Sequence, residues 1–173
     1  MHSQPSVLDA IRVRRSVRRV LPDPVSPETV EEVLDAARWA PSGLNNQPWR
    51  FLIVRSPEKR EALARCTRYG ELLRSAPAAV AVFLSRSASY SRDKDLQGVG
   101  AALQNLLLAA HACGLGACWL GEILNRRKEA EAALGVPSDL ELMAVVTLGW
   151  PADEGPHGDA ERRPLADLVV GEV

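Results

Sequence analysis

Residues 41–49 read Pro41-Ser42-Gly43-Leu44-Asn45-Asn46-Gln47-Pro48-Trp49 and join a predicted helix to a predicted strand. Hydroxyl and carboxamide side chains are concentrated here between two prolines. Such residues are common in turns for local backbone reasons, but a turn needs neither Gln47 nor Trp49. The hydroxyl and carboxamide groups are uncharged hydrogen-bond donors and acceptors, and such groups can bind a polar heterocycle without an ionic contact. The pattern therefore predicts a rigid binding loop, and an ordinary turn is the alternative.

Helices and strands are mixed along the chain on both sides of this connector. Ser6, Ser26 and Ser56 are expected to cap helices, and Pro27 is typical of a first helical position. The predicted helices lie near residues 7–14, 26–40, 56–64, 98–113 and 123–134, and the predicted strands at 51–54, 79–84, 117–120 and 142–148. Because this order lacks the steady alternation of a doubly wound sheet, it indicates an α+β fold. The strand at 142–148 is nearly all apolar, so we expect it in mid-sheet.

Length and composition limit the class of protein. The chain has 173 residues, of which 46% are apolar, and its net charge is −1. This length predicts a single domain over residues 1–173 with a sizeable core. The near-neutral charge favours neither a nucleic-acid partner nor an acidic membrane. No apolar run has the length of a membrane span and no signal-like segment begins the chain, so we expect a cytoplasmic protein.

Five arginines surround Ser16: Arg12, Arg14, Arg15, Arg18 and Arg19. Guanidinium groups bind phosphate oxygens in pairs, and a hydroxyl adds a further donor. The segment therefore predicts a site for a single phosphate group. A second pair, Arg162 and Arg163, would grip the same phosphate if the two segments converge. A solvated basic surface is one alternative, and a nucleic-acid patch is another, although the segment lacks interleaved aromatic residues.

Segment 114–119 contains two glycines and partly matches a dinucleotide-binding fingerprint. Trp119 occupies the place of the final glycine, and the segment follows a helix where that motif requires a strand. We expect it instead to present backbone N–H groups near Leu120, Gly121 and Glu122 to a ligand that approaches the main chain closely.

The sequence gives little support for a metal site or for catalysis by acid–base side chains. The three cysteines cannot all pair in one chain and lack the spacing of zinc ligands, so no metal site is expected. Cys118 is expected to be buried, with a place in a pocket wall as the alternative. His111 falls on a predicted buried helix, where a core role is expected. No serine-hydrolase or metalloprotease motif is present, so an enzyme of this sequence would rely on a bound cofactor.

The C-terminal segment 165–173 is rich in apolar residues. A run such as Leu168-Val169-Val170 is costly to leave in water and too short to form its own core. We therefore expect this tail to dock, and another subunit is one candidate surface.

Taken together, these segments resemble the nitroreductase family of flavin enzymes. The matching blocks follow the family's order over residues 7–170 and are Arg14-Arg15-Ser16-Val17-Arg18, then Ala40-Pro41-Ser42 with Asn45 and Gln47-Pro48-Trp49, then Gln104-Asn105-Leu106, then Gly114-Leu115-Gly116 with Cys118-Trp119. The resemblance implies an α+β fold with a central mixed β-sheet flanked by helices. It also implies an intertwined homodimer, with the C-terminal tail reaching the partner subunit and FMN at the interface.

The resemblance further implies roles for individual residues. The arginines and serine of the first block would hold the phosphate and ribityl chain, helped by Arg162 or Arg163. Connector residues of the partner subunit would border the flavin ring, and a backbone N–H after the last block would reach flavin N5. No side chain is expected to be catalytic. The residues expected to bind FMN are Arg14, Arg15, Ser16, Arg18, Pro41, Ser42, Asn45, Gln47, Leu120, Gly121, Glu122, Arg162 and Arg163.

The activity implied by the resemblance is electron transfer from NADH or NADPH to a nitroaromatic, quinone or similar small-molecule acceptor, with ping-pong kinetics. Another flavin chemistry on the same scaffold, such as reductive dehalogenation, flavin breakdown or dehydrogenation, is an alternative. A non-catalytic FMN-storage protein is a second. The chain departs from many members at Gly98, where an acidic residue is usual and only Asp95 lies nearby. The charged segment from Arg86 to Lys94 would suit a zwitterionic substrate.

Overall fold

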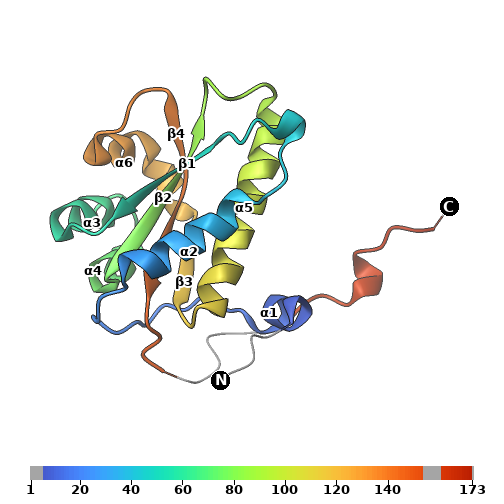
Figure 1. The fold of residues 1–173 in the computed structure, drawn as a ribbon, viewed down its shortest axis with the longest axis horizontal. Helices are drawn as coiled ribbons and strands as arrows, with labels where there is room; N and C mark the ends of the chain where they lie inside the picture. Colours follow the sequence, from blue (N-terminus) through green and yellow to red (C-terminus); the bar gives the residue numbers. More distant parts are fainter. Residues whose placement is uncertain (1–5, 154–160, 173) are drawn as a thin grey trace.

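The computed structural model describes residues 6–153 and 161–172. Its centre is a four-stranded sheet in the order β1-β2-β4-β3, with helices on both faces (Figure 1). The strands are β1 (Trp49–Val54), β2 (Ala78–Ser85), β3 (Gly116–Leu120) and β4 (Leu140–Gly149). The α+β class is confirmed, and so is the expected place of β4 inside the sheet. All three strand pairs are antiparallel, so the parallel part of the expected mixed sheet is limited to a single bridge between Ser16 and Ala117.

The sheet is buried on both faces, which explains why β2 is apolar at every position except its last. Val80, Val82 and Leu84 face one core and Ala81 and Phe83 face the other, as the two-residue period of a strand requires. The first core lies under α2 (Pro27–Arg38) and α5 (Arg92–Ala112), and the second under α3 (Pro57–Ala64), α4 (Gly70–Ser75) and α6 (Arg127–Leu134). The short α1 (Val7–Val13) lies near the C-terminal end of α5 (Figure 1).

Serine caps start three of the helices, as predicted from the sequence. The hydroxyls of Ser6, Ser26 and Ser56 each accept a hydrogen bond from the backbone N–H three residues later, at 3.2 Å. Each such cap stabilises a helix by about 1 kcal/mol. Pro27 and Pro57 occupy the first helical positions, where a missing N–H costs nothing.

The main differences from the prediction concern α5, the helix at 123–134 and α4, while several other ends shift by one or two residues. Helix α5 begins at Arg92, six residues before the predicted start, because its first turn is charged and hides the apolar pattern. The predicted helix at 123–134 is a 3₁₀ turn, η2 (Glu122–Arg126), followed by α6. Helix α4 was not predicted, since six residues are too few to show a helical period.

Two glycines allow the N-terminal segment to lie directly on the sheet. A Cβ at Gly116 would be 2.6 Å from Cγ1 of Val17, and one at Gly149 would be 2.9 Å from Cβ of Val20. Both distances are shorter than a Cβ contact allows. The backbone that bears the first arginine block is therefore held against β3 and the end of β4.

The segment from residue 161 to 172 extends away from the body of the molecule (Figure 1). It contains the short 3₁₀ helix η3 (Leu165–Asp167), and its apolar side chains are exposed, with Leu165 at 74% and Leu168 at 60%. One copy of the chain therefore does not provide the docking surface that the sequence predicts for this tail.

Candidate functional site

The first arginine block follows α1 and runs beside β3. Ser16 forms a parallel bridge with Ala117, and the backbone N–H of Val17 donates to the Ala117 carbonyl at 3.0 Å. These contacts fix the block at the sheet edge next to β3.

Arg14 has the most distinctive environment in this block. Its side chain is half-buried, and its Nε is buried with no hydrogen-bond partner among the described residues. Burial is the main cause that lowers the pKa of Arg14, and the positive charges of Arg15 and Arg162 lower it further. The charge of Arg162 therefore acts on the same region as the N-terminal arginines. Positive groups gathered in this way would be stabilised by an anion.

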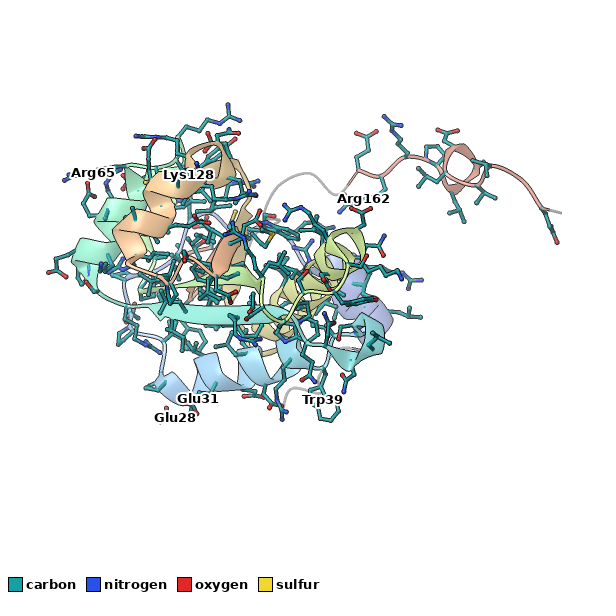
Figure 2. The ribbon with its side chains drawn as sticks, turned by 90° about the horizontal axis from the view of Figure 1, so that it is seen from above. Glu28, Glu31, Trp39, Arg65, Lys128 and Arg162 are labelled. Atoms are coloured by element: carbon teal, nitrogen blue, oxygen red, sulfur yellow. The ribbon has the colours of Figure 1, made fainter. Side chains whose placement is uncertain are left out.

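The other arginines of the predicted site are less constrained. Arg15 donates from Nη1 to the carbonyls of Arg12 at 2.6 Å and Arg14 at 2.9 Å. Arg18 is exposed and approaches the Ser16 carbonyl at 3.4 Å. Arg163 is exposed, and Arg162 begins the extended tail (Figure 2).

A pocket of about 170 Å³, called here the β3 pocket, adjoins this block. Its lining comes from the first arginine block, from the end of β3 with the turn that follows, and from the start of α4. The lining residues are Arg18, Tyr69, Leu72, Cys118, Trp119, Leu120, Gly121 and Glu122. The structure therefore brings the predicted backbone donors at 120–122 next to the arginine block. Tyr69 and Leu72 were not predicted, because α4 was missed.

The Glu122 carboxylate ties two walls of the β3 pocket together. Thr67 Oγ1 donates to Glu122 Oε2 at 2.5 Å, and the backbone N–H of Arg68 donates to the same oxygen at 3.2 Å. The Thr67 hydrogen bond is the main cause that lowers the pKa of Glu122. These bonds hold the turn after α3 against η2, so the backbone at 120–122 has a fixed position.

Burial also affects two residues beside the arginine block. It raises the pKa of the Cys118 thiol, against the opposing charges of Arg18 and Arg14. Burial lowers the pKa of His111, and the Arg14 charge lowers it further. Cys118 is buried and also lines the β3 pocket, whereas His111 is only half-buried rather than in the core. The three cysteines are free thiols. His2 and His157 lie outside the described residues.

The connector at 41–47 has an unusual backbone. Leu44, Asn45 and Gln47 have φ values of 55°, 53° and 46°, in the left-handed region that favours glycine. Such conformations cost about 1–3 kcal/mol each and persist where surrounding contacts enforce them, commonly at ligand sites. The Ser42 hydroxyl accepts from the Gln47 backbone at 3.1 Å, and the Gln47 carboxamide donates to the Asn45 carbonyl at 3.1 Å. This strained, cross-linked backbone favours the binding-loop interpretation over the ordinary turn.

A buried carboxylate anchors the connector to α5. Asp95 is 1% exposed and accepts from Asn46 Nδ2 at 2.7 Å, from the Ser89 hydroxyl at 2.6 Å, and from the backbone N–H groups of Tyr90 and Ser91. Burial alone would raise the pKa of Asp95, but the hydrogen bonds from Ser89 and Asn46 outweigh it and the net pKa is lowered. Asp95 therefore fixes the loop, three residues before Gly98.

A second pocket, called here the connector pocket, has a volume of about 310 Å³. It lies between the connector and the N-terminal half of α5. The lining residues are Pro41, Ser42, Gly43, Tyr90, Lys94, Gln97, Gly98 and Ala101. Sequence reasoning identified Pro41 and Ser42 but missed Tyr90, Lys94 and Gln97, whose only signal was their place in the charged segment before and within the first turns of α5.

The two groups of predicted residues lie at opposite ends of α5. The connector packs near Gly98, where a Cβ would be 3.4 Å from the Pro41 carbonyl oxygen. The arginine block lies near the C-terminal end of the helix, where the charge of Arg14 lowers the pKa of His111, and α5 ends at Ala112. Fourteen residues of helix separate these points, which is about 21 Å at 1.5 Å per residue. One chain therefore brings together the arginine block with residues 120–122, but not the connector.

The described residues offer neither a metal-ion site nor a membrane-spanning helix. Residues 6–153 and 161–172 contain no group of three His, Cys, Asp or Glu that could hold a metal ion. Over the same ranges no helix combines the length and apolar character needed to cross a membrane.

Comparison with known proteins gives consistent matches over almost the whole chain. The model of the nitroreductase family matches residues 11–68 and 64–150. A candidate NADH dehydrogenase/NAD(P)H nitroreductase of Archaeoglobus fulgidus is 37% identical over 165 residues, covering 94% of this chain and 95% of that protein. The 5,6-dimethylbenzimidazole synthase of Rhodospirillum rubrum is 33% identical over 187 aligned residues, covering 90% and 87%.

A solved structure is similar at the level of the whole fold. The crystal structure of a candidate nitroreductase from Desulfovibrio desulfuricans, in complex with FMN, has a TM-score of 0.90 to this chain. The two sequences are 48% identical, and the match covers 99% of each chain.

Proposed function

Because this chain belongs to the nitroreductase family, we propose that it is an FMN-dependent oxidoreductase. It takes electrons from NADH or NADPH and passes them to a nitroaromatic, quinone or similar conjugated acceptor. The observation that supports this most directly is the environment of Arg14, with its unpartnered Nε and its neighbouring positive charges. The structural relative in complex with FMN supports the same cofactor here.

The residues at the sheet edge fit the phosphate end of FMN. Arg14, Arg15 and Arg162 concentrate positive charge, and Ser16 adds a hydroxyl beside them. Guanidinium groups and a hydroxyl are the donors that phosphate oxygens accept best. FMN would therefore bind with its phosphate at this block and its ring toward the β3 pocket.

Protein groups at the β3 pocket would orient the ring. FMN supplies the electron-transfer chemistry when bound, while the protein provides position and electrostatics. Backbone N–H groups at residues 120–122 would donate to the ring, and the Glu122 bonds to Thr67 and Arg68 hold that backbone still. Donor and acceptor would use the same open site in turn, which predicts ping-pong kinetics.

We propose that the connector completes the site from a second copy of the chain. The connector packs beside the N-terminal half of α5, too far from the arginine block of its own chain to reach it. Its residues that are expected to bind FMN are Pro41, Ser42, Asn45 and Gln47. Large apolar side chains are exposed beside the connector, with Trp39 at 73% (Figure 2) and Leu44 at 85%. Together with the apolar tail, these surfaces support a homodimer.

A different flavin chemistry is the second candidate. The 33% identity to a 5,6-dimethylbenzimidazole synthase favours keeping it, since a related chain of similar length has an activity other than nitroreduction. A storage role for FMN would share the phosphate site but not the reaction with nicotinamide.

The spectrum of the purified protein and its response to NADH and NADPH test the proposal. We expect a yellow protein whose visible absorption bleaches on anaerobic mixing with one or both nicotinamides and returns on adding a nitroaromatic or quinone. Bleaching by dithionite alone would support storage. A colourless protein that takes up no FMN would reject the proposal.

A further inference from the structure

We propose that the connector pocket selects the electron acceptor, and that Lys94 makes it select planar aromatic acceptors with an anionic substituent such as a carboxylate. This inference rests on the proposed function, because the connector would border the flavin. It goes further by naming the class of acceptor and the residue that recognises it.

The pocket has the size of a site for a single-ring ligand. Its volume of about 310 Å³ is at the lower end of the range for small-molecule sites, roughly 300–1,000 Å³. Pro41, Gly98 and Ala101 provide flat, apolar wall. Gly98 contributes no side chain, and this allows the connector to pack closely against the helix, with the Pro41 carbonyl oxygen 3.4 Å from the position of a Gly98 Cβ.

The polar groups of the pocket are mainly donors. The Lys94 ammonium lies 5.4 Å from the centroid of the Tyr90 ring, and Gln97 lies one turn further along α5. The Ser42 hydroxyl accepts from the Gln47 backbone, so its own proton remains available to a ligand. An ammonium, an amide and a hydroxyl facing one small space favour a guest with negative oxygens.

Lys94 is not neutralised by the described part of the protein. It forms no ion pair with a described carboxylate under a 4.0 Å limit. Asp95, the next residue, is buried and already accepts four hydrogen bonds from Asn46 and residues 89–91. The Lys94 charge is therefore free to act on a ligand.

Tyr90 fixes the position of the cation. Its hydroxyl lies so close to Gly43 that a Cβ there would be 1.7 Å away, so the ring is packed onto the connector backbone. The ammonium over this ring gains a cation–π contact. Lys94 is itself exposed, and this contact favours a position of its side chain beside the connector.

The experiment compares two acceptors of the same size, 4-nitrobenzoate and 4-nitrobenzamide, with the flavin-loaded wild type and Lys94→Gln. The ratio of kcat/KM for the anion to that for the amide is expected to fall about tenfold or more in Lys94→Gln, mostly through KM, as for loss of one charge-assisted contact. Lys94→Arg should restore most of the ratio. Lys128→Gln, on α6 in the other helix layer (Figure 2), should leave the ratio unchanged.

A binding measurement separates failure of this inference from failure of the proposed function. Calorimetric titration of 4-nitrobenzoate into the protein as purified needs no turnover, and Lys94→Gln should raise the Kd of 4-nitrobenzoate about tenfold or more. An unchanged Kd and an unchanged ratio of acceptors in a protein that NADH or NADPH bleaches would overturn the role of Lys94 alone. If neither nicotinamide bleaches the protein, the proposed function fails, and the Kd of 4-nitrobenzoate still decides whether Lys94 binds anions.

Discussion

At the scale of single residues, Arg14 and Arg15 provide the clearest test of the phosphate site. Replacing both by alanine should weaken FMN binding about a hundredfold or more, because each charge-assisted contact contributes about 1.5–3 kcal/mol. Equilibrium titration of the apoprotein with FMN, followed by flavin fluorescence, measures the effect.

The matched control for this double variant is Arg65→Ala with Arg74→Ala. It makes the same change in net charge at two arginines that pair with Glu61 on the surface. FMN affinity should stay within about twofold of wild type, as expected for exposed charges that contact a carboxylate and do not line the β3 pocket. Full flavin occupancy after loss of Arg14 and Arg15 would instead assign the block to solvated surface.

Asp95 provides a prediction about stability and pH. Asp95→Asn should lower the free energy of unfolding by about 2 kcal/mol at pH 7, because it removes a buried charged acceptor of four hydrogen bonds. The pKa of Asp95 is lowered in the folded protein, so its stabilisation is complete above the unfolded pKa of about 3.9 and declines as the pH falls below that value. Urea unfolding of wild type and variant at pH 7 and pH 3 measures this difference.

The exposed neighbour Asp93 is the control, since it lies in the same helical turn. Asp93→Asn should leave the unfolding free energy nearly unchanged at both pH values. A destabilisation of Asp95→Asn that is equally large at pH 3 would show that shape, and not charge, holds the connector.

At the scale of elements, the junction between the turn after α3 and η2 is expected to control the backbone of the β3 pocket. Thr67→Val removes the hydroxyl that donates to Glu122 while keeping a similar shape. Amide hydrogen exchange at residues 121–125 should become faster, and the pKa of Glu122 should rise, because the Thr67 bond is the main cause of its lowering.

The control for Thr67→Val is the same substitution at a threonine far along the chain, Thr29. Thr29→Val removes a hydroxyl that contacts Ser26 at the start of α2 and should leave exchange at 121–125 as in wild type. If Thr67→Val also left it unchanged, the Arg68 bond to Glu122 and the packing of Ile123 would be sufficient to hold η2.

The elements that the sequence predicted well are those with a local signal. Serine caps and prolines located α2 and α3, and an apolar run located β4. The start of α5 was missed because Asp95, which looks like a surface residue, is buried by contacts with Asn46, 49 positions earlier in the chain.

The residues of the candidate site also fall into those that the sequence indicated and those that it did not. Residue type alone indicated the arginine block and the connector. Tyr90 and Lys94 could not be predicted, because their place in a pocket depends on a close contact with Gly43 that no periodicity encodes. Likewise, the sequence predicted the helix at 98–113 but not that the connector packs beside Gly98, at the far end of that helix from the arginine block.

At the scale of the whole molecule, the C-terminal tail tests the proposed dimer. Leu165→Ser with Leu168→Ser should weaken dimerisation at least about a hundredfold, since full burial of each leucine contributes about 1.5–3 kcal/mol. Sedimentation over a range of protein concentrations gives the dissociation constant.

Asp167→Ser, between the two leucines, is the control and should leave the dissociation constant within about twofold. A wild-type chain that sediments as a monomer at micromolar concentration while still binding FMN would contradict the dimer. The connector would then have to serve a function separate from the flavin.

Gly116 and Gly149 give the fold a consequence that reaches beyond the sheet. Neither residue can contact a ligand through a side chain, yet both determine how closely the N-terminal segment packs on the sheet. Val17 lies against Gly116 of β3, and Val20 lies against Gly149 of β4. Any larger residue at these two places would act as a wedge and lift the arginines away from the strand edge. Affinity for FMN therefore depends on keeping glycine at these two positions, as well as on keeping the arginines. Even one added methyl group at either position would displace the backbone that carries the arginines.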